Sequence, residues 1–211
     1  MFDLSLYLVT DRSLSKGRSI EWIVEKAVKG GVTMVQLREK DCSTREFVEL
    51  AIRLKQKLRP RNVPLIINDR LDVALAADAD GLHIGQSDMP YEIARYLLGT
   101  NKIIGLSVEN MKQAHEANLL DVDYIGISPV FSTPTKTDTN QPFGIEGVRK
   151  VMSFLRHPAV VIGGINSSNA VEIIRAGANG IAVVSAICGA DDPQKAAQGL
   201  KTLLNFNNEM E

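Results

Sequence analysis

The stretch "ADADGLHIGQ" (residues 77–86) decides the fold, because its pattern recurs three more times along the chain. Each copy carries the end of a helical segment, a turn of small residues, and then a short apolar run typical of a strand. The other copies are "KGGVTMVQLRE" (29–39), "LDVDYIGISP" (120–129) and "AGANGIAVVS" (176–185). Four such copies predict a fold built from four double strand–helix units.

Eight short apolar runs are present along the 211 residues, and the four copies supply every second one. Near-continuous apolar runs are typical of parallel strands that helices cover. Eight strand–helix units in a chain of this length predict an α/β fold, a single-domain (β/α)8 TIM barrel over residues 1–211. A doubly wound open sheet is the alternative, but it usually has fewer strands, and no GxGxxG motif follows the first run. The runs span residues 4–10, 34–39, 64–69, 81–85, 102–108, 124–130, 159–164 and 180–186.

Amphipathic segments that separate the runs indicate helices. Residues 19–28 and 43–58 each place their apolar side chains on one stripe, as a helix packed on a core does. Ser43, followed by Glu46 three residues later, has the pattern of a capping box at the start of the second segment. The segment 166–177 ends in glycine, as helices often do.

Composition narrows the class of protein. Charges nearly cancel, with 24 basic and 25 acidic residues, and no basic stripe or acidic tail indicates a nucleic acid or an anionic membrane as partner. The first residues are too acidic, and their apolar part too short, for a signal peptide. Cys42 and Cys188 lack metal-ligand spacing and are typical of reduced thiols. We therefore expect a soluble, cytoplasmic protein; a homo-oligomer is left open.

Polar residues gather where the runs end, which is where a TIM barrel carries its site. Gln36, Arg38 and Lys40 alternate at the end of the second run, so an extended strand points all three to one face. Two cations and an amide on one face suit a phosphate or a diphosphate. The alternative is a strand end whose charges are simply solvated.

Two carboxylates follow neighbouring runs. Asn68 and Asp69 end the third run, and Asp88 lies shortly after the fourth. Magnesium binds through one or two carboxylates and completes its shell with water and substrate phosphates, so this pair predicts a Mg2+ site. The alternative for both aspartates is capping of the next helix. That alternative is stronger for Asp72, which we leave out of the site.

The last two runs predict a second anion site of a different kind. Gly163 and Gly164 let backbone N–H groups approach an anion, and helices starting near Ser167 and after Ser185 add positive ends. Loops after the seventh and eighth strands are the usual phosphate site of this barrel, which indicates a monophosphate near Gly164, Val184 and Ser185.

Three further features bear on the chemistry. Ser107 ends the fifth run and can bond a ligand or cap the next helix, while His83 lies inside a run and can face the ligand or the core. We expect His115 and His157 to be structural or exposed. No nucleophile triad, HExxH or CxxC motif is present. The lack of an obvious general base favours a reaction in which cations and a metal support a leaving group.

Seven ordered motifs together resemble the thiamine-phosphate synthase (thiamine-phosphate pyrophosphorylase) family, and the resemblance runs from Tyr7 to about Ile187. The motifs are "LYLVTD", "QLREK", "INDRLDVA", "ADGLHIGQSD", "GISPVFSTPTKTDT", "VIGGIN" and "GIAVVSAI". The resemblance implies a (β/α)8 barrel and a transferase of thiamine biosynthesis. Such an enzyme couples a hydroxymethylpyrimidine diphosphate to a thiazole phosphate, or its carboxylated form, with magnesium. Diphosphate leaves first, and the thiazole nitrogen then attacks the pyrimidine cation.

The resemblance also implies a role for each matching position. Arg38, Lys40 and Lys136 would be catalytic, because they would stabilise the departing diphosphate. The pyrimidine diphosphate would be bound by Gln36, Arg38, Lys40, Asn68, Ser107 and Lys136, and Mg2+ by Asp69 and Asp88. The thiazole phosphate would be bound by Thr133, Pro134, Thr135, Gly164, Val184 and Ser185. In this reading the long polar loop "SPVFSTPTKTDTN" (128–140) covers two phosphorylated small molecules.

One position departs from the family pattern, since Ser128 stands where the family usually has glycine, beside the pyrimidine end of the site. Three other functions compete with synthesis. A related thiazole tautomerase would not need the diphosphate and magnesium residues. A phosphosugar isomerase or epimerase would need a placed acid–base pair. A non-catalytic binding protein for thiamine intermediates would bind without turnover.

Overall fold

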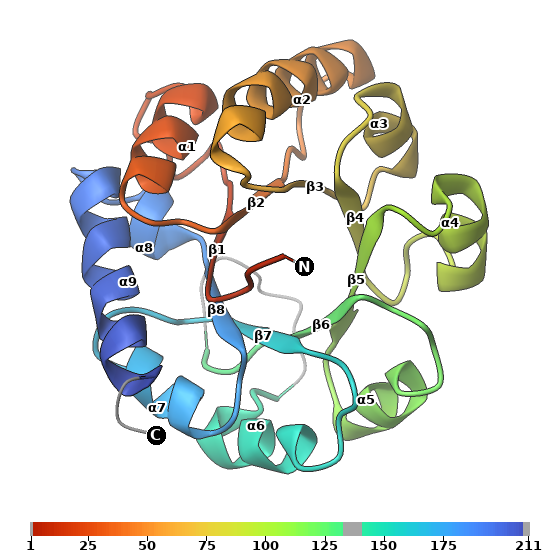
Figure 1. Ribbon diagram of the computed structural model, residues 1–211, viewed down its shortest axis with the longest axis vertical. Coiled ribbons are helices and arrows are strands. Elements are labelled where there is room, and N and C mark those ends of the chain that lie inside the picture. The colour runs from red at the N-terminus through yellow and green to blue at the C-terminus, as the bar shows by residue number, and fades with distance from the viewer. Residues whose placement is uncertain (1, 133–140, 209–211) are drawn as a thin grey trace.

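Eight parallel strands close into a barrel in the computed structural model, which describes residues 2–132 and 141–208. Each strand pairs with its neighbours in sequence, and the last pairs with the first (Figure 1). The predicted (β/α)8 barrel is confirmed, whereas its extension to one domain over residues 1–211 stays a prediction. The strands are β1 (Leu6–Val9), β2 (Met34–Leu37), β3 (Leu65–Asn68), β4 (Gly81–Ile84), β5 (Ile103–Val108), β6 (Tyr124–Ile127), β7 (Ala159–Ile162) and β8 (Gly180–Val183).

Helices follow the strands and form a ring outside the barrel (Figure 1). The last two follow β8, and α9 packs against α1 and α7. Over the described ranges, no helix has both the length and the apolar composition needed to cross a membrane. The helices are α1 (Ile20–Lys29), α2 (Thr44–Leu58), the 3-10 helix η1 (Arg59–Arg61), α3 (Leu71–Ala76), α4 (Tyr91–Leu98), α5 (Met111–Ala117), α6 (Gly144–Met152), α7 (Ala170–Arg175), α8 (Ser185–Cys188) and α9 (Pro193–Asn208).

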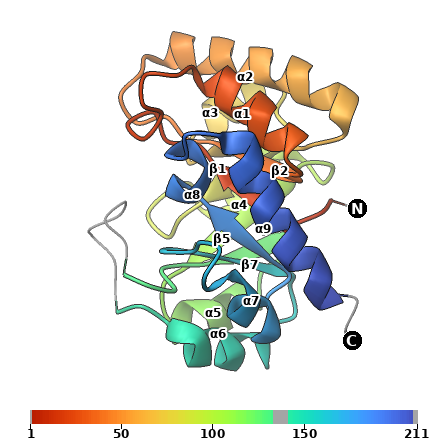
Figure 2. The ribbon, with the colours of Figure 1, turned by 90° about the vertical axis from the view of Figure 1, so that its left-hand side faces the viewer.

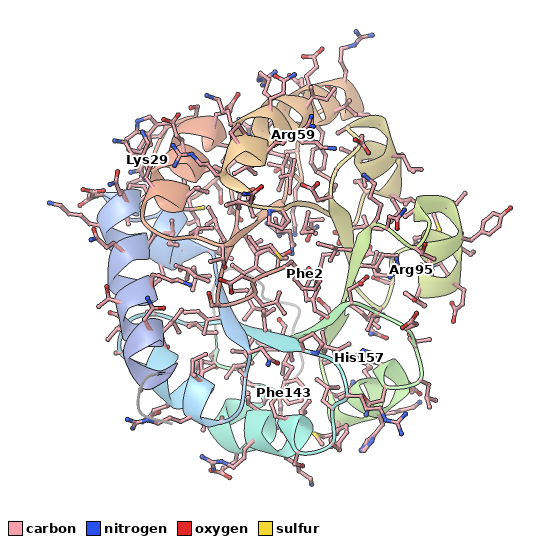
Figure 3. The ribbon with its side chains drawn as sticks, viewed as in Figure 1. Phe2, Lys29, Arg59, Arg95, Phe143 and His157 are labelled. Carbon is pink, nitrogen blue, oxygen red and sulfur yellow. The ribbon has the colours of Figure 1, made fainter. Side chains whose placement is uncertain are left out.

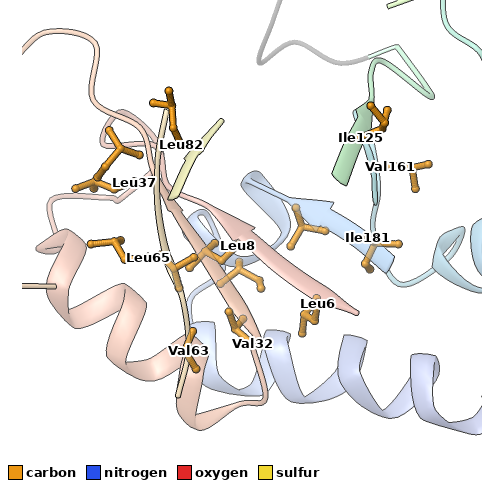
Figure 4. Packing of buried hydrophobic residues seen from close by; sticks show 14 of the residues in the cluster. Leu6, Leu8, Val32, Leu37, Val63, Leu65, Leu82, Ile125, Val161 and Ile181 are labelled. Carbon is orange, nitrogen blue, oxygen red and sulfur yellow. The ribbon is translucent and has the colours of Figure 1, made fainter. Parts of the chain in front are cut away.

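Alternation along each strand divides the core into two layers. In β1, Leu6 and Leu8 point outward and pack with the helices, as the cluster in Figure 4 shows, while Tyr7 and Val9 point into the barrel. The inner layer contains Leu4, Tyr7, Val9, Met34, Ile66, Tyr124, Val160 and Ala182. These side chains thus fill the barrel toward the N-terminal ends of the strands. The inward-facing residues that follow them in each strand reach the C-terminal ends.

The N-terminal end of the barrel is covered by the first residues of the chain. Phe2 lies over the middle of the ring in Figure 3, and its side chain meets Tyr124 edge to face, with ring centroids 6.1 Å apart. Figure 2 places the N-terminus on one side of the barrel, beyond the strands. The C-terminal ends of the strands are therefore the open end.

Two helix starts show how local chemistry sets the boundaries. Ser43 and Glu46 form the predicted capping box of α2. In contrast, α7 begins at Ala170 and not near Ser167. The Asn166 side chain accepts from the backbone N–H of Ser168 at 2.9 Å, and such local bonds compete with helix formation.

Candidate active site

A cavity of about 510 Å3 lies among the C-terminal ends of the strands. Every predicted site residue within the described ranges lines this cavity. These residues are Gln36, Arg38, Lys40, Asn68, Asp69, Asp88, Ser107, Gly164, Val184 and Ser185. The other candidates, Thr133, Pro134, Thr135 and Lys136, lie outside the described residues.

Arg38 is held in the cavity by a partner from the neighbouring strand end. Its guanidinium donates to Asp11 at 3.0 Å, and the two side chains are only 18% and 12% exposed. Its backbone N–H donates to the hydroxyl of Thr10 at 3.0 Å. The alternative of a freely solvated strand end is therefore wrong for Arg38. Since a guanidinium has five N–H donors, those not used by Asp11 remain for a ligand.

The two other charged side chains at this strand end, Lys40 and Glu39, point in different directions. Lys40 is exposed, lines the cavity and forms no ion pair with another described residue. Glu39 does not line the cavity and accepts two hydrogen bonds from Arg12, each 2.9 Å long. The predicted alternation thus brings cations to the cavity and turns the intervening carboxylate away.

Asp69 and Asp88 face the cavity and do not cap helices. The helix after β3 has Arg70 at its N-cap and the helix after β4 has Pro90, neither with a side-chain cap bond. Capping is therefore wrong as the alternative for both aspartates. Asp69 instead has φ +62°, in the left-handed region that non-glycine residues seldom adopt and that is enriched at functional sites. Asp72, which pairs with Arg70 at 2.6 Å, does not line the cavity.

The two aspartates affect each other. Desolvation in the cavity, the charge of Asp88 and a hydrogen bond between the two carboxyl groups raise the pKa of Asp69 to about 6, although part of the side chain remains exposed. Asp88 also accepts from the N–H of Gly85 at 2.7 Å, which fixes its direction. Two close carboxylates repel each other when both are charged. A divalent cation between them would remove this repulsion, so the pair suits such an ion.

The donor set suits magnesium in particular. Within the residues described, no group of three or more His, Cys, Asp or Glu side chains is placed to hold a metal ion. A cation bound by Asp69 and Asp88 would therefore need further oxygen ligands from water and substrate. Mg2+ is commonly held in this way, by one or two carboxylates and phosphate oxygens.

The opposite side of the cavity carries no charged residue among the predicted candidates. Gly163 and Gly164 have φ +109° and +68°, which glycine adopts without strain. The Gly164 carbonyl accepts from the side-chain amides of Asn166 at 3.3 Å and Asn169 at 3.0 Å. Val184, at the start of α8, completes this side. Because α7 and α8 are short, the two glycines and the Ser185 hydroxyl are the better anion donors.

A row of hydrogen bonds crosses the cavity floor. Gln36 Nε2 donates to the Tyr7 hydroxyl at 3.0 Å, and the hydroxyls of Tyr7 and Tyr124 are 2.8 Å apart. His83 then contacts Tyr124 through Nδ1 and Ser107 Oγ through Nε2, each at 2.8 Å. His83 thus belongs both to the interior and to the cavity.

Several of these residues were not singled out from the sequence. Asp11, Tyr7 and Tyr124 were missed, although both tyrosines occupy inward positions of predicted strands. Asn110 caps α5 by accepting from Gln113, so the capping alternative for Ser107 is wrong. As expected for a structural role, His115 stacks on Phe154 with ring centroids 4.0 Å apart.

The root of the loop after β6 is anchored to the end of β7 at the cavity rim. Val130 and Phe131 donate to the carbonyls of Ile162 and Gly163 at 3.0 and 3.1 Å. Beyond the loop, Phe143 donates to the carbonyl of Pro129 at 2.9 Å. Ser128, at the start of the loop, lines the cavity. Both ends of the loop are thus fixed beside the site.

Comparison with known proteins adds an independent observation. A family model described as thiamine monophosphate synthase matches residues 6–187. The thiamine-phosphate synthase of Syntrophomonas wolfei is 54% identical over 205 residues, covering 97% of this chain and 98% of that protein. The thiamine-phosphate synthase of Vibrio campbellii is 53% identical over 199 residues, covering 94% of this chain and 97% of that protein.

Solved structures agree with these matches. Thiamine phosphate pyrophosphorylase from Pyrococcus furiosus superposes with a TM-score of 0.89 at 41% identity, over 96% of both chains. A 3-hexulose-6-phosphate synthase superposes with a TM-score of 0.67 at only 16% identity, over 95% of this chain and 99% of that one. That second likeness shows the barrel fold alone.

Proposed function

This chain belongs to the thiamine monophosphate synthase family, and we propose that its cavity catalyses thiamine-phosphate synthesis. The substrates are a 4-amino-2-methylpyrimidine carrying a diphosphooxymethyl group and a thiazole carrying a phosphooxyethyl group, or its carboxylated form. The products are thiamine phosphate and pyrophosphate, together with CO2 when the thiazole is carboxylated. The enzyme is a transferase, because the pyrimidinylmethyl group passes from the diphosphate oxygen to the thiazole nitrogen.

The observation that carries this proposal is the joining of two unlike anion sites in one cavity. One side presents Arg38, Lys40 and the carboxylate pair, which suits a diphosphate with its metal. The other side presents Gly164 and Ser185, which suit a monophosphate bound by backbone and hydroxyl donors. The reaction brings two phosphorylated substrates together, and one cavity with two different anion sites can hold both at once.

Bond breaking is assisted by charge. The bond between the pyrimidine methylene carbon and the diphosphate oxygen breaks, and its electron pair leaves with the diphosphate. Arg38 and Lys40 stabilise the negative charge that develops on that oxygen, and Asp11 holds Arg38 ready for it. The thiazole nitrogen then donates its lone pair to the methylene cation, so no side chain has to remove a proton in this step.

Asp69 and Asp88 would hold Mg2+ against the diphosphate. When bound, the ion neutralises phosphate charge and so improves the leaving group. Gln36, Asn68 and Ser107 hold and orient the pyrimidine ring above the cavity floor. The cavity walls exclude water, which would otherwise compete with the thiazole nitrogen for the cation.

The proposal is tested by the products. The protein is mixed with both phosphorylated precursors and Mg2+, and pyrophosphate and thiamine phosphate are measured; a parallel sample contains excess EDTA. We expect both products in equal amounts, and their loss with EDTA. Absence of product at high enzyme concentration would overturn synthesis. Conversion of a thiazole phosphate isomer without pyrophosphate release would indicate a tautomerase instead.

Lys136, outside the described residues, has a separate test. We propose that it reaches the diphosphate from the loop after β6. The Lys136→Ala variant should therefore lose turnover by about 100-fold or more while its circular dichroism spectrum stays unchanged. An unchanged rate would remove Lys136 from the mechanism.

A further inference from the structure

The row of hydrogen bonds on the cavity floor connects two groups that face the substrate. Gln36 lies at one end and Ser107 at the other, and both line the cavity. Three side chains from three other strands lie between them, namely Tyr7 of β1, Tyr124 of β6 and His83 of β4. Each contact is 2.8 to 3.0 Å long, so the row is continuous.

The two tyrosines in the middle of this row are buried, and their hydroxyl groups are uncharged. Tyr7 and Tyr124 are 1% and 0% exposed, and desolvation by burial raises the pKa of both hydroxyls well above the ordinary value. Each hydroxyl therefore keeps its single proton. Because both side chains are buried, that proton is donated within the row.

Two glycines leave the room that the row occupies. A Cβ at Gly105 would lie 2.1 Å from the Tyr124 ring, and a Cβ at Gly126 would lie 3.1 Å from the His83 ring. Any larger residue at position 105 would displace the tyrosine from the barrel interior. The sequence of the neighbouring strands is thus adapted to this arrangement.

Each hydroxyl has one proton, and when the His83 ring also carries a single N–H, only two arrangements make the row continuous. In the first, the Gln36 amide donates to Tyr7, Tyr7 to Tyr124, and Tyr124 to His83 Nδ1. His83 then carries its proton on Nε2 and donates to Ser107, whose own proton turns to the cavity. In the second, every bond is reversed, so Ser107 donates to His83 and offers the cavity only an acceptor.

The orientation of the Gln36 amide in the structure favours the first arrangement. Because Gln36 Nε2 is the atom next to the Tyr7 hydroxyl, its carbonyl oxygen is left to accept from a ligand. Ser107, at the other end, is left to donate. The two ends therefore present opposite hydrogen-bond characters, and neither can change without the other.

We propose that Tyr7, Tyr124 and His83 are positioning residues that couple Gln36 to Ser107 and so select the pyrimidine. The selected ring carries an amino donor, which the Gln36 oxygen accepts, and a ring-nitrogen acceptor, which the Ser107 hydroxyl meets. A 4-oxo pyrimidine presents the reverse characters and is rejected, because buried polar groups would be left unpaired. This inference rests on the proposed function for the identity of the substrate, whereas the coupling itself does not.

The coupling is tested without substrate by nitrogen NMR of the full chain labelled with 15N-histidine. The wild type should show His83 with its proton on Nε2 alone. The Gln36→Leu variant removes the first donor without touching His83, and it should turn His83 into a mixture of both tautomers. His115 and His157 serve as internal controls, and a His83→Asn sample assigns the signal. A tautomer identical in wild type and Gln36→Leu would overturn the coupling.

The selection is tested by kinetics with the 4-amino pyrimidine diphosphate and its 4-oxo analogue. The wild type should prefer the amino compound strongly in kcat/KM. The Tyr124→Phe variant, which still fills the space beside Gly105, should lose at least about 10-fold of that preference, equal to about 1.4 kcal/mol. Tyr96→Phe is the matched control, because Tyr96 is 85% exposed and outside the cavity.

The outcomes separate the possible failures. If Tyr124→Phe lowers kcat/KM equally for both compounds, the ratio of the two values stays unchanged. Tyr124 would then have only a structural role, and the proposed selection would be overturned. If Tyr124→Phe does not fold, as judged by its thermal transition, Tyr7→Phe interrupts the same row. If the wild type makes product from neither compound, the proposed function fails, while the tautomer measurement still decides the coupling.

Discussion

The two sides of the cavity differ in the groups that they offer to an anion. The side formed by the ends of β2, β3 and β4 uses full charges, with Arg38 and Lys40 beside the pair Asp69 and Asp88. The side formed by the ends of β7 and β8 uses neutral donors, with glycines of positive φ and the hydroxyl of Ser185. The protein therefore separates a charged subsite from a neutral one across a single barrel.

Under the proposed function, this difference distinguishes the two phosphates of the substrates. Full charges suit the group on which negative charge increases during the reaction, and they must be held by partners such as Asp11. A neutral subsite suits a phosphate whose charge does not change, because it binds substrate and transition state equally. Substitutions on the charged side should therefore act mainly on turnover, and those on the neutral side mainly on KM.

The largest effect should come from Arg38→Ala. We expect kcat to fall by about 100- to 1000-fold, because a donor to the leaving group is lost. Steady-state kinetics with both precursors measures this change. The matched control is Arg12→Ala, since Arg12 lies at the same strand ends but pairs with Glu39 outside the cavity. Equal losses in both variants would contradict the assignment of Arg38.

A smaller effect, on binding, should come from Gly164→Ala. A Cβ there would lie 2.9 Å from Cβ of Phe131, and alanine disfavours φ +68°. We expect KM for the thiazole phosphate to rise by about 10- to 100-fold, the value of one charge-assisted hydrogen bond. Gly99→Ala is the control, because Gly99 has φ +75° and open space around it. Equal changes of KM in the two variants would show a general strain effect.

Ser185→Ala should act more weakly still. Only one hydroxyl donor is removed, and the backbone N–H groups beside Gly164 remain. We expect KM for the thiazole phosphate to rise by about 3- to 10-fold, with kcat nearly unchanged. A loss confined to kcat would instead show that Ser185 acts on the reacting atoms. The proposed difference between the two sides would then be wrong for this residue.

The smallest effect concerns stability and pH. The folded-state pKa of Asp69, about 6, lies above its ordinary 3.8, so the native state holds this proton more tightly than the unfolded chain. This stabilisation is complete below pH 4 and is lost as the pH rises through 6. Between pH 4.5 and 7.5 in EDTA, the wild type should lose at most about 1 kcal/mol relative to Asp69→Asn, since the group is partly exposed.

Urea unfolding of both proteins at the two pH values measures this difference. Groups that titrate in both proteins cancel in the comparison. Addition of Mg2+ at pH 7.5 should stabilise the wild type more than Asp69→Asn, because binding to the native state adds to its stability. A greater stabilisation of the variant would exclude Asp69 as a ligand.

Local patterns predicted much of this molecule correctly. The four copied stretches located β2, β4, β6 and β8, because apolar runs of that length between helical segments suit a buried parallel sheet. Alternation placed Gln36, Arg38 and Lys40 on one face, as the cavity lining bears out. Both statements depend only on residues close together in the chain, although β2 itself ends at Leu37 and the alternation continues beyond it.

Other features depended on contacts that no local pattern contains. Asp11 meets Arg38 across 27 positions of sequence, and Tyr7 meets Tyr124 across 117. The role of Asp69 was also open, because a residue directly after a strand can either cap the next helix or face the cavity. Only the closed barrel decided it, by turning this carboxylate toward Asp88.

The sequence by itself therefore determined the order of strands and helices, the inward and outward faces, and most of the residues that meet at the cavity. These follow from periodicity, which is a property of neighbouring residues. The tertiary structure alone decided which polar groups pair, how Arg38 is held, and that Tyr7, Tyr124 and His83 join Gln36 to Ser107. The physical reason is that barrel closure brings strands distant in sequence within hydrogen-bond distance, and burial then requires their polar groups to find partners.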